Sequence, residues 1–382
     1  MQSNQIWKIY GTAFREMTLK LLKETDLEAL IRGKTGAGTD PGSIRIGIKP
    51  NLVCPTPSSF GATTHTEILE GIIEYLQGRG YSDIVIAEGS WVGDRTSEAY
   101  EYCGYRSLCE KYGVPFVDAQ KEKSHEVDAA GMKLNITDVA DTFDFLINVP
   151  VLKGHCQTRV TCALKNMKGL LPNTEKRRFH QMGLHKPIAH LSTVLKPDFI
   201  VVDHICGDYD FEEGGNPVVR NCIMAALDPV LMDSYACRII GYTADDVPYI
   251  RLAEQLGTGT ADLDALEIVH LGGSREESTG VYEDDERPRE HKVLSVKYAV
   301  DEADSCSACY ANLVPALMQL EEEGLLEKLP EKIAIGQGHQ GRRGTLGIGR
   351  CTKDYDFCVM GCPPDTEKIY GELKKYTEEY SV

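Results

Sequence analysis

Apolar residues in the first 270 positions alternate between short runs and longer stretches with helical spacing. Residues 44–50 (IRIGIKP) and 84–87 predict two buried strands. Thr64 and Glu67 have the spacing of a capping box at the start of a helix between these strands. The apolar face of that helix and its terminating glycines are Ile68, Leu69, Ile72, Ile73, Leu76, Gly78 and Gly80. This pattern predicts a β-α-β unit with two parallel strands.

The alternation continues towards the C-terminus. The later predicted elements are a helix at 97–113, a strand at 116–117, a hairpin at 125–136, and strands at 145–149, 199–203 and 268–271. Asp228 and Pro229 have the residue types preferred at the N-cap and at the first position of a helix. Strands that alternate with helices predict an α/β fold, a mostly parallel sheet with flanking helices.

A change in composition divides the chain near residue 275. Residues 275–292 are highly charged and have no hydrophobic period, so we interpret them as a solvated linker. The predicted parts are an α/β domain at residues 1–274 and a small cysteine-rich unit at residues 293–382. A length of 382 residues is typical of two domains.

Composition and charge exclude several classes of protein. Hydrophobic residues make up 42% of the chain and charged residues 26%, which excludes a disordered or fibrous chain. The formal net charge of −17 argues against nucleic acid or anionic lipid as a partner. Because we find no signal peptide and no apolar run near the ~20 residues that a bilayer needs, we expect a soluble, cytoplasmic protein.

The chain has 13 cysteines and no export signal, so reduced thiols and a metal are expected. Five of them lie close to the C-terminus: Cys306, Cys309, Cys351, Cys358 and Cys362. Thiolates bind iron–sulfur clusters and zinc, and four ligands are needed for either. Cys306, Cys309 and Cys362 are the expected ligands, while Cys351 and Cys358 compete for the fourth position.

The surroundings of these thiols favour an iron–sulfur cluster of the [4Fe-4S] type. The C-x3-C-P sequence that ends at Pro363 is typical of the close of a ferredoxin-type motif. Glycines between positions 336 and 361 allow backbone amides to approach a cluster. A zinc ribbon usually has two tight C-x2-C pairs, and this chain has one. Zinc and unliganded thiols are the alternatives.

Residues 153–190 are basic in an otherwise acidic chain. Eight lysines and arginines against one acid give this segment a charge of +7, and it also holds four histidines. It directly follows the predicted strand at 145–149, and ligands of open α/β sheets bind beyond the carboxyl ends of strands. The sequences Lys49-Pro-Asn51 and Glu88-Gly-Ser90 also follow predicted strands, so we expect these groups to converge on one crevice.

We expect this crevice to hold a small anionic molecule. The candidate catalytic residues are Lys153, His155 and Lys165. The candidate substrate-binding residues are Lys49, Asn51, His65, Glu88, Asn166, Lys168 and His180. The alternative interpretation is a solvated basic face or a zone of internal salt bridges with the surplus acids.

Several motifs together resemble the domain-of-unknown-function family 362 over roughly residues 44–245. They are Lys49-Pro-Asn51, Glu88-Gly-Ser90, Lys153-Gly-His155, Val160-Thr-x-Ala-Leu-Lys165-Asn166-x-Lys-Gly169 and Asp228-Pro-Val-x-x-Asp233. The resemblance implies an iron–sulfur association and a cytoplasmic protein, commonly in anaerobes, and supplies no established reaction. The repeated ferredoxin run that members often carry is absent here, and the set from Cys306 to Cys362 replaces it.

These features predict an iron–sulfur oxidoreductase that acts on a small anionic substrate. One alternative is a lyase or isomerase that uses the cluster as a Lewis acid or a structural staple. Another is a non-catalytic electron-transfer or assembly protein. The expected partners are the small anion and an electron-transfer protein, with a homodimer as a further option, and neither nucleic acid nor a membrane.

Overall fold

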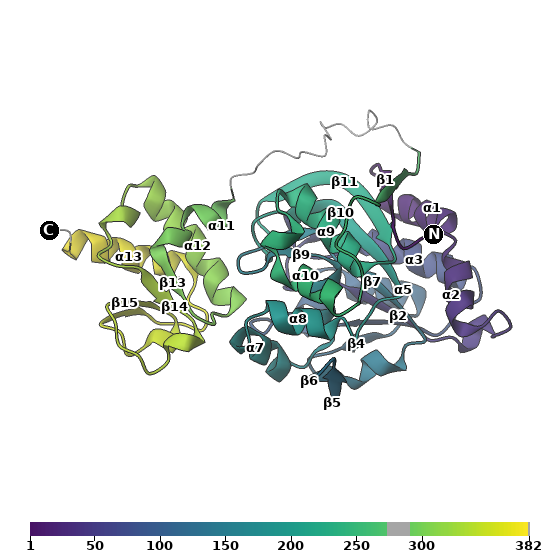
Figure 1. The fold of residues 1–382 in the computed structure, drawn as a ribbon, viewed down its shortest axis with the longest axis horizontal. Coiled ribbons are helices and arrows are strands. Elements are labelled where there is room, and N and C mark those ends of the chain that lie inside the picture. Colours follow the sequence, from purple (N-terminus) through teal and green to yellow (C-terminus); the bar gives the residue numbers. More distant parts are fainter. Residues whose placement is uncertain (273–290, 381–382) are drawn as a thin grey trace. The chain divides into compact units, whose positions relative to one another are not determined.

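The structure is a computed structural model that describes residues 1–272 and 291–380 (Figure 1). The chain divides into two compact units. The main unit comprises Met1–Lys176 and His185–Arg287, and the C-terminal unit comprises Arg177–Leu184 and Pro288–Val382. Most of the predicted linker at 275–292 lies outside the described residues.

The main unit is built on an eight-stranded sheet with the order β12-β1-β11-β10-β7-β2-β3-β4. These strands are β1 (Gln5–Tyr10), β2 (Ile46–Pro50), β3 (Ile84–Glu88), β4 (Phe116–Asp118), β7 (Phe145–Val149), β10 (Phe199–Asp208), β11 (Pro217–Ala226) and β12 (Glu267–His270). Neighbouring strands are parallel except where β11 pairs with β1 and β10. The predicted mostly parallel α/β sheet is therefore confirmed.

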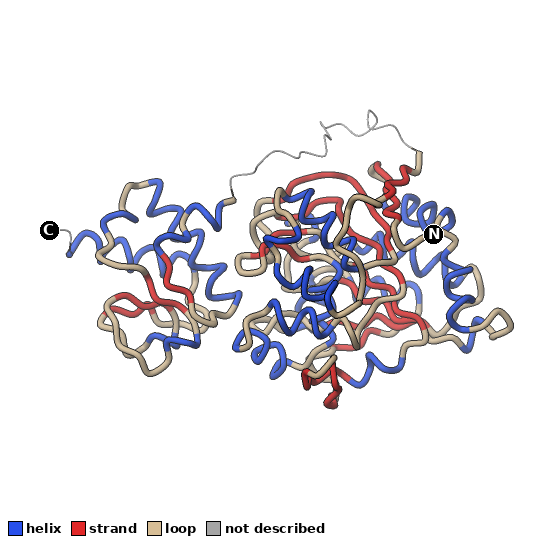
Figure 2. The backbone as a smooth tube through the Cα atoms, in the orientation of Figure 1, coloured by secondary structure: helices blue, strands red, loops and turns tan. Residues whose placement is uncertain are grey.

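Helices and two hairpins surround this sheet, as the ribbon and tube views show (Figures 1 and 2). The helices are α1 (Phe14–Glu24), α2 (Leu27–Thr35), α3 (Thr66–Gln77), α4 (Thr96–Tyr102), α5 (Tyr105–Tyr112), α6 (Ala163–Asn166), α8 (His185–Leu191), α9 (Pro229–Ile240) and α10 (Pro248–Gln255). Helix α7 (Asn173–Gln181) is divided between the two units, since its residues from Arg177 onward group with the C-terminal unit. The hairpins are β5 (Ser124–Ala129) with β6 (Met132–Thr137), and β8 (Lys153–His155) with β9 (Arg159–Thr161). None of the helices in the described part of the chain has the length and apolar character that crossing a bilayer requires.

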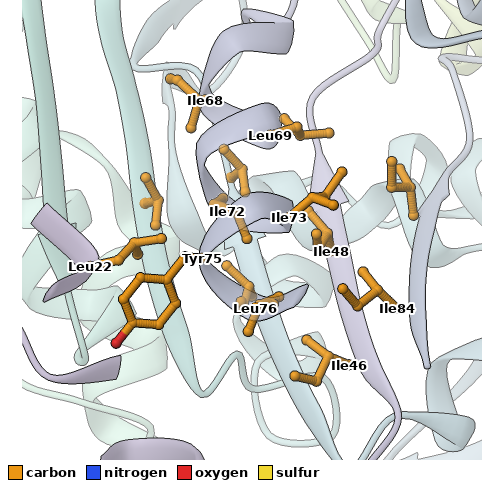
Figure 3. Packing of buried hydrophobic residues seen from close by; sticks show 14 of the residues in the cluster. Leu22, Ile46, Ile48, Ile68, Leu69, Ile72, Ile73, Tyr75, Leu76 and Ile84 are labelled. Carbon is orange, nitrogen blue, oxygen red and sulfur yellow. The ribbon is translucent and has the colours of Figure 1, made fainter. Parts of the chain in front are cut away.

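The predicted apolar face of α3 packs on the sheet. Its five aliphatic side chains are fully buried and lie over Ile46, Ile48 and Ile84 of β2 and β3 (Figure 3). Complete burial of one such side chain stabilises the fold by about 1.5–3 kcal/mol. This packing anchors the β2-α3-β3 unit and so fixes the positions of the loops that follow β2 and β3.

Two local predictions were wrong for identifiable reasons. Thr64 does not cap α3, whose N-cap is His65. The Thr64 hydroxyl instead accepts from the Asn51 amide and donates to the Val149 carbonyl, both at 2.8 Å, and so provides a partner for two buried backbone groups. The predicted helix at 97–113 is broken into α4 and α5 by Gly104, whose φ of 81° is left-handed.

The C-terminal unit has its own four-stranded sheet, in which all neighbours are parallel. Its strands are β13 (Val300–Glu302), β14 (Ile333–Ile335), β15 (Leu346–Ile348) and β16 (Phe357–Val359), in that spatial order. Its helices are α11 (Lys292–Ser295), α12 (Ser307–Glu322) and α13 (Thr366–Tyr380). Because the strands are parallel, their carboxyl ends lie along one edge of this small sheet.

Gly154 provides a test of the packing at the end of β7. It lies in β8, and a Cβ added there would stand 2.2 Å from the Tyr209 carbonyl oxygen. We expect Gly154→Ala to destabilise the main unit by about 1–3 kcal/mol because the backbone must shift. Gly33→Ala is the control, since Gly33 lies in α2 with open space around it, and alanine there favours the helix. Urea unfolding measures both; equal effects would contradict the packing argument.

Candidate functional site

The sheet topology brings the predicted strand-end residues together. β2 lies between β7 and β3 and is parallel to both. Lys49 forms an ion pair with Glu88, and the Lys153 ammonium donates to Asn51 Oδ1 over 3.0 Å. Together with their buried partners these residues form what we call the strand-end network: Lys49, Asn51, Glu88, Asn148, Lys153, His155, Lys165, Asn166, Lys176 and Glu212.

Lys49 and Glu88 are both buried, and burial disfavours the charged form of each side chain. Burial lowers the pKa of Lys49, and burial raises the pKa of Glu88, while each charge partly offsets the shift of the other. Lys176 donates to the carbonyls of Gly89 (2.8 Å) and Ser90 (2.9 Å), and burial lowers its pKa to about 8. The end of β3 is thus lined by amines whose protons are held less tightly than in water.

Lys153 occupies the centre of the network and is completely buried. Besides Asn51, its ammonium donates to the carbonyls of Ala62 (2.6 Å) and Glu212 (2.7 Å). Three acceptors match the three donors of an ammonium group, and burial lowers the pKa of Lys153 to about 8. This predicted catalytic lysine therefore ties three chain segments together.

Glu212 joins the other two predicted catalytic residues. Its carboxylate pairs with Lys165 and accepts from His155 Nε2 over 3.0 Å. His155 Nδ1 accepts from the amides of Gln157 and Thr158 at 3.0 Å, which places the ring proton on Nε2. Burial, followed by the Lys165 charge, lowers the pKa of His155 to about 4, so the ring is neutral near pH 7. The positive Lys165 and the bond from His155 outweigh burial and hold the pKa of Glu212 well below its usual value.

Buried amides and carboxylates position the helix that carries Lys165. Asn166 donates to Asn148 Oδ1 at 2.7 Å and accepts from Asn51 at 2.9 Å. Asp233 accepts from the amides of Ala163 (2.6 Å) and Leu164 at the start of α6, and burial raises its pKa to about 7. Asp228 accepts from Val230 and Leu231, so its predicted capping role is confirmed.

His65 lies at the same edge but has a different partner. Its backbone amide and its Nδ1 both lie 2.8 Å from Asp203 Oδ2. Burial acts against protonation, but the charge of Asp203 and its hydrogen bond raise the pKa of His65 to about 10. Asp203 and its neighbour Cys206 are functional candidates that the sequence analysis did not select.

The last two predicted binding residues differ in their place: the charge of Lys168 acts on His155, whereas His180 lies outside the network. Lys168 is half-buried in the turn Met167–Leu170. His180 is buried in α7, within the stretch Arg177–Leu184 that groups with the C-terminal unit, so it is not a member of the strand-end network. The lysines of the network face Glu88, Glu212 and backbone carbonyls, which agrees with the alternative interpretation of internal salt bridges.

Four of the five C-terminal cysteines follow strand ends of the small parallel sheet. Cys306 is the N-cap of α12 after β13, Cys309 lies in the first turn of α12, Cys351 follows β15, and Cys362 follows β16. A Cβ on Gly349 would stand 3.7 Å from the Cys309 sulfur, and the Arg350 amide donates to the Gly361 carbonyl over 2.9 Å. We call these four cysteines the thiol group.

Members of the thiol group act on one another electrostatically. Burial raises the pKa of Cys309 to about 12, and the charges of Cys306, Cys362 and Cys351 add to this effect. Amide donors also point at two of the sulfurs, because Gln337 Nε2 lies 3.6 Å from Cys306 and Gln340 Nε2 lies 3.5 Å from Cys351.

Cys358 stands apart from this group. It lies within β16, and its sulfur contacts Thr352 Oγ1 (3.4 Å) and the Gly349 carbonyl (3.5 Å). Burial raises its pKa, with opposing contributions from Thr352 and Lys368 and none from another thiol. Among the described residues, no three Cys, His, Asp or Glu side chains are arranged as a site for a single metal ion.

The His65–Asp203 pair makes the stability of the main unit depend on pH. Because the pKa of His65 rises from 6.5 to about 10 on folding, its contribution is complete below pH 6.5 and is lost as the pH rises through 10. We expect His65→Gln to cost about 1.5–3 kcal/mol at pH 6, with the difference from wild type shrinking towards pH 10. His125→Gln, at a half-exposed pair with Asp138, is the control. A pH-independent loss in chemical unfolding would argue against a charged pair.

Two known proteins are similar to parts of this chain. The thylakoid-associated protein sll1697 of Synechocystis sp. is 23% identical over 236 residues, which cover 59% of this chain and 71% of that protein. The lactate racemase apoprotein of Thermoanaerobacterium thermosaccharolyticum is 15% identical in sequence, with a TM-score of 0.39. That match covers 61% of this chain and 57% of the racemase chain, less than two thirds of its length.

A family model matches residues 46–238, a range that includes the strand-end network and ends before the thiol group. This match covers half of the chain, and it confirms the family that the motifs around Lys49, Glu88 and Lys153 predicted. The chain belongs to the family described as Domain of unknown function (DUF362).

Proposed function

We propose that this chain is an iron–sulfur oxidoreductase that acts on a small anionic substrate. The observation that carries the proposal is the thiol group, in which four cysteines from three chain segments share one edge of a parallel sheet. Thiolates are the ligands that iron–sulfur clusters prefer, and four of them match a [4Fe-4S] cluster. Such a cluster, when bound, supplies one-electron transfer.

The surroundings of the thiol group support this choice of ligands. Hydrogen bonds to cluster sulfurs and ligand thiolates tune the reduction potential, and Gln337 and Gln340 direct amide donors at two members. Gly349 has a left-handed φ of 87°, which favours glycine, and it lies in van der Waals contact with the Cys309 sulfur just before Cys351. We therefore propose Cys351 as the fourth ligand in preference to Cys358.

The main unit offers Lys165 as the residue that contacts an anion. Lys153 has an acceptor for each of its protons, whereas Lys165 pairs with Glu212 alone among the described residues. A buried ammonium group with unused donors favours an additional acceptor, and an anionic group of a substrate provides one. Glu212, itself held by His155, fixes the direction of the Lys165 side chain.

Exchange of single thiols tests the ligand set. We expect Cys362→Ser, purified without oxygen, to lose most of its iron and its broad absorbance near ~400 nm, whereas wild type retains about four irons per chain. Cys358→Ser is the matched control and should keep both, because its sulfur contacts Thr352. One zinc per chain without colour would favour the zinc alternative, and cluster loss in Cys358→Ser alone would overturn the assignment of Cys351.

Exchange of Lys165 tests the anion site separately. We expect Lys165→Met to weaken binding of phosphate or small carboxylates about tenfold or more, because one charge-assisted hydrogen bond is lost. Lys111→Met, at an exposed pair with Glu70, is the control. Titration calorimetry measures the affinity, and iron content should be unchanged in both variants. If Lys165→Met binds these anions as tightly as wild type does, the proposed anion site is wrong, while the proposed cluster is not affected by this result.

A further inference from the structure

We propose that Cys206, His65 and Asp203 form a nucleophilic thiol centre in the main unit, whose substrate class is a small acyl ester or thioester. This centre is separate from the thiol group and from the lysines of the strand-end network. A cysteine, an imidazole and a carboxylate in hydrogen-bonded order are the elements of a thiol activated by a general base.

The three side chains have the connectivity that such a centre needs. Asp203 Oδ2 accepts from the amide and the Nδ1 of His65 at 2.8 Å, and its Oδ1 accepts from the Ile205 amide at 3.1 Å. Nδ1 donates its proton to Asp203, and Nε2, on the other side of the ring, faces the Cys206 sulfur 3.9 Å away. The sulfur also lies 3.3 Å from the Ser58 carbonyl oxygen, which can accept a hydrogen bond from the thiol.

The backbone of β10 is irregular at the point where it presents Cys206. The pairing of β10 with β11 shifts its register between His204 and Cys206, as in a β-bulge. Bulges redirect a side chain and are common next to active sites. Asp203 itself is bonded to the end of β7, since its amide donates to the Pro150 carbonyl over 2.8 Å. The centre therefore lies at the carboxyl edge of the parallel strands, where α/β proteins bind ligands.

The surroundings of the His65 ring give it a positive charge beside the Cys206 sulfur. Asp203 and Cys206 are the titratable groups that act on its ring, and the Phe14 ring of α1 lies edge-on at 5.7 Å. With a pKa of about 10, His65 is an imidazolium near pH 7, and reactive cysteines are found in such electropositive surroundings.

Cys54 provides an internal comparison for Cys206. The two residues are 4% and 5% exposed, so a reagent reaches them with similar difficulty. Cys54 has a threonine hydroxyl at 3.3 Å in place of an imidazole, and burial raises its pKa to about 11. A difference in reactivity between these two cysteines therefore reports chemistry and not access.

The covalent step is an acyl transfer to sulfur. The Cys206 sulfur, having given its proton to His65 Nε2, attacks the carbonyl carbon of the ester or thioester. The bond from the acyl carbon to the leaving oxygen or sulfur breaks, and the leaving group takes the proton from Nε2. The acyl group remains on Cys206 as a thioester, with no oxidant or reductant consumed.

The test uses full-length protein purified without oxygen and two probes, iodoacetamide and p-nitrophenyl acetate. Peptide mass mapping follows each cysteine over time between pH 6 and 9. We expect iodoacetamide to modify Cys206 at least about tenfold faster than Cys54 at pH 7, and p-nitrophenyl acetate to leave an acetyl group on Cys206. In His65→Gln, the rate at Cys206 should fall towards that of Cys54, with iron content unchanged.

Three outcomes would overturn the proposal. They are equal rates at Cys206 and Cys54 in the wild type, no modification of Cys206 while the chain is folded, and a Cys206 rate that His65→Gln leaves unchanged. Asp203→Asn provides a second variant if His65→Gln fails to fold. It should lower the Cys206 rate at pH 7 and change its pH profile, which a residue with only a structural role would not do.

Discussion

Charged groups buried at the carboxyl ends of parallel strands have to be compensated inside the protein, and this constraint organises the main unit. A buried ammonium or carboxylate without a partner costs several kcal/mol, so each must be paired and hydrogen-bonded. Lys49 is matched by Glu88, Lys165 by Glu212, and Lys153 by a side-chain oxygen and two carbonyls. The loops that supply these partners are held in place by the same contacts.

The need to pair buried charges also explains two glycines that carry no reactive group, Gly154 and Gly169. Gly154 allows the Tyr209 carbonyl to approach β8, and Gly169 leaves room for the Glu88 carboxylate and the Lys49 side chain. A methyl group at either position would occupy space that the charged groups or their loops need. Ion pairs of this kind are costly to build and are retained where they position other groups, which is the role that Glu212 has between His155 and Lys165.

The C-terminal unit uses the same topological rule with a different chemistry. Its parallel strands present their carboxyl ends along one edge, and the loops after β13, β15 and β16 carry the thiol group. The family match ends before the five C-terminal cysteines, and the strand-end network and the thiol group lie in different compact units of the chain.

The sequence by itself determined those features that depend on neighbouring residues. Hydrophobic spacing was enough for β2, α3 and β3, since side chains three and four positions apart share a helix face. The N-cap at Asp228 and the C-x2-C spacing of Cys306 and Cys309 also depend only on neighbouring residues. Strands β1 and β11 escaped prediction because their place in the sheet depends on antiparallel pairing with each other across the chain.

The tertiary structure alone decided which distant groups meet. Glu212 is 47 positions from Lys165, and Asp203 is 138 positions from His65, so no local pattern connects either pair. Spacing gave no difference between Cys351 and Cys358, whereas in the structure the Cys358 sulfur contacts the Thr352 hydroxyl. Burial, charge pairing and the imidazole beside Cys206 arise only when the loops after several parallel strands fold onto one edge, since electrostatic interactions depend on distance in space and not along the chain.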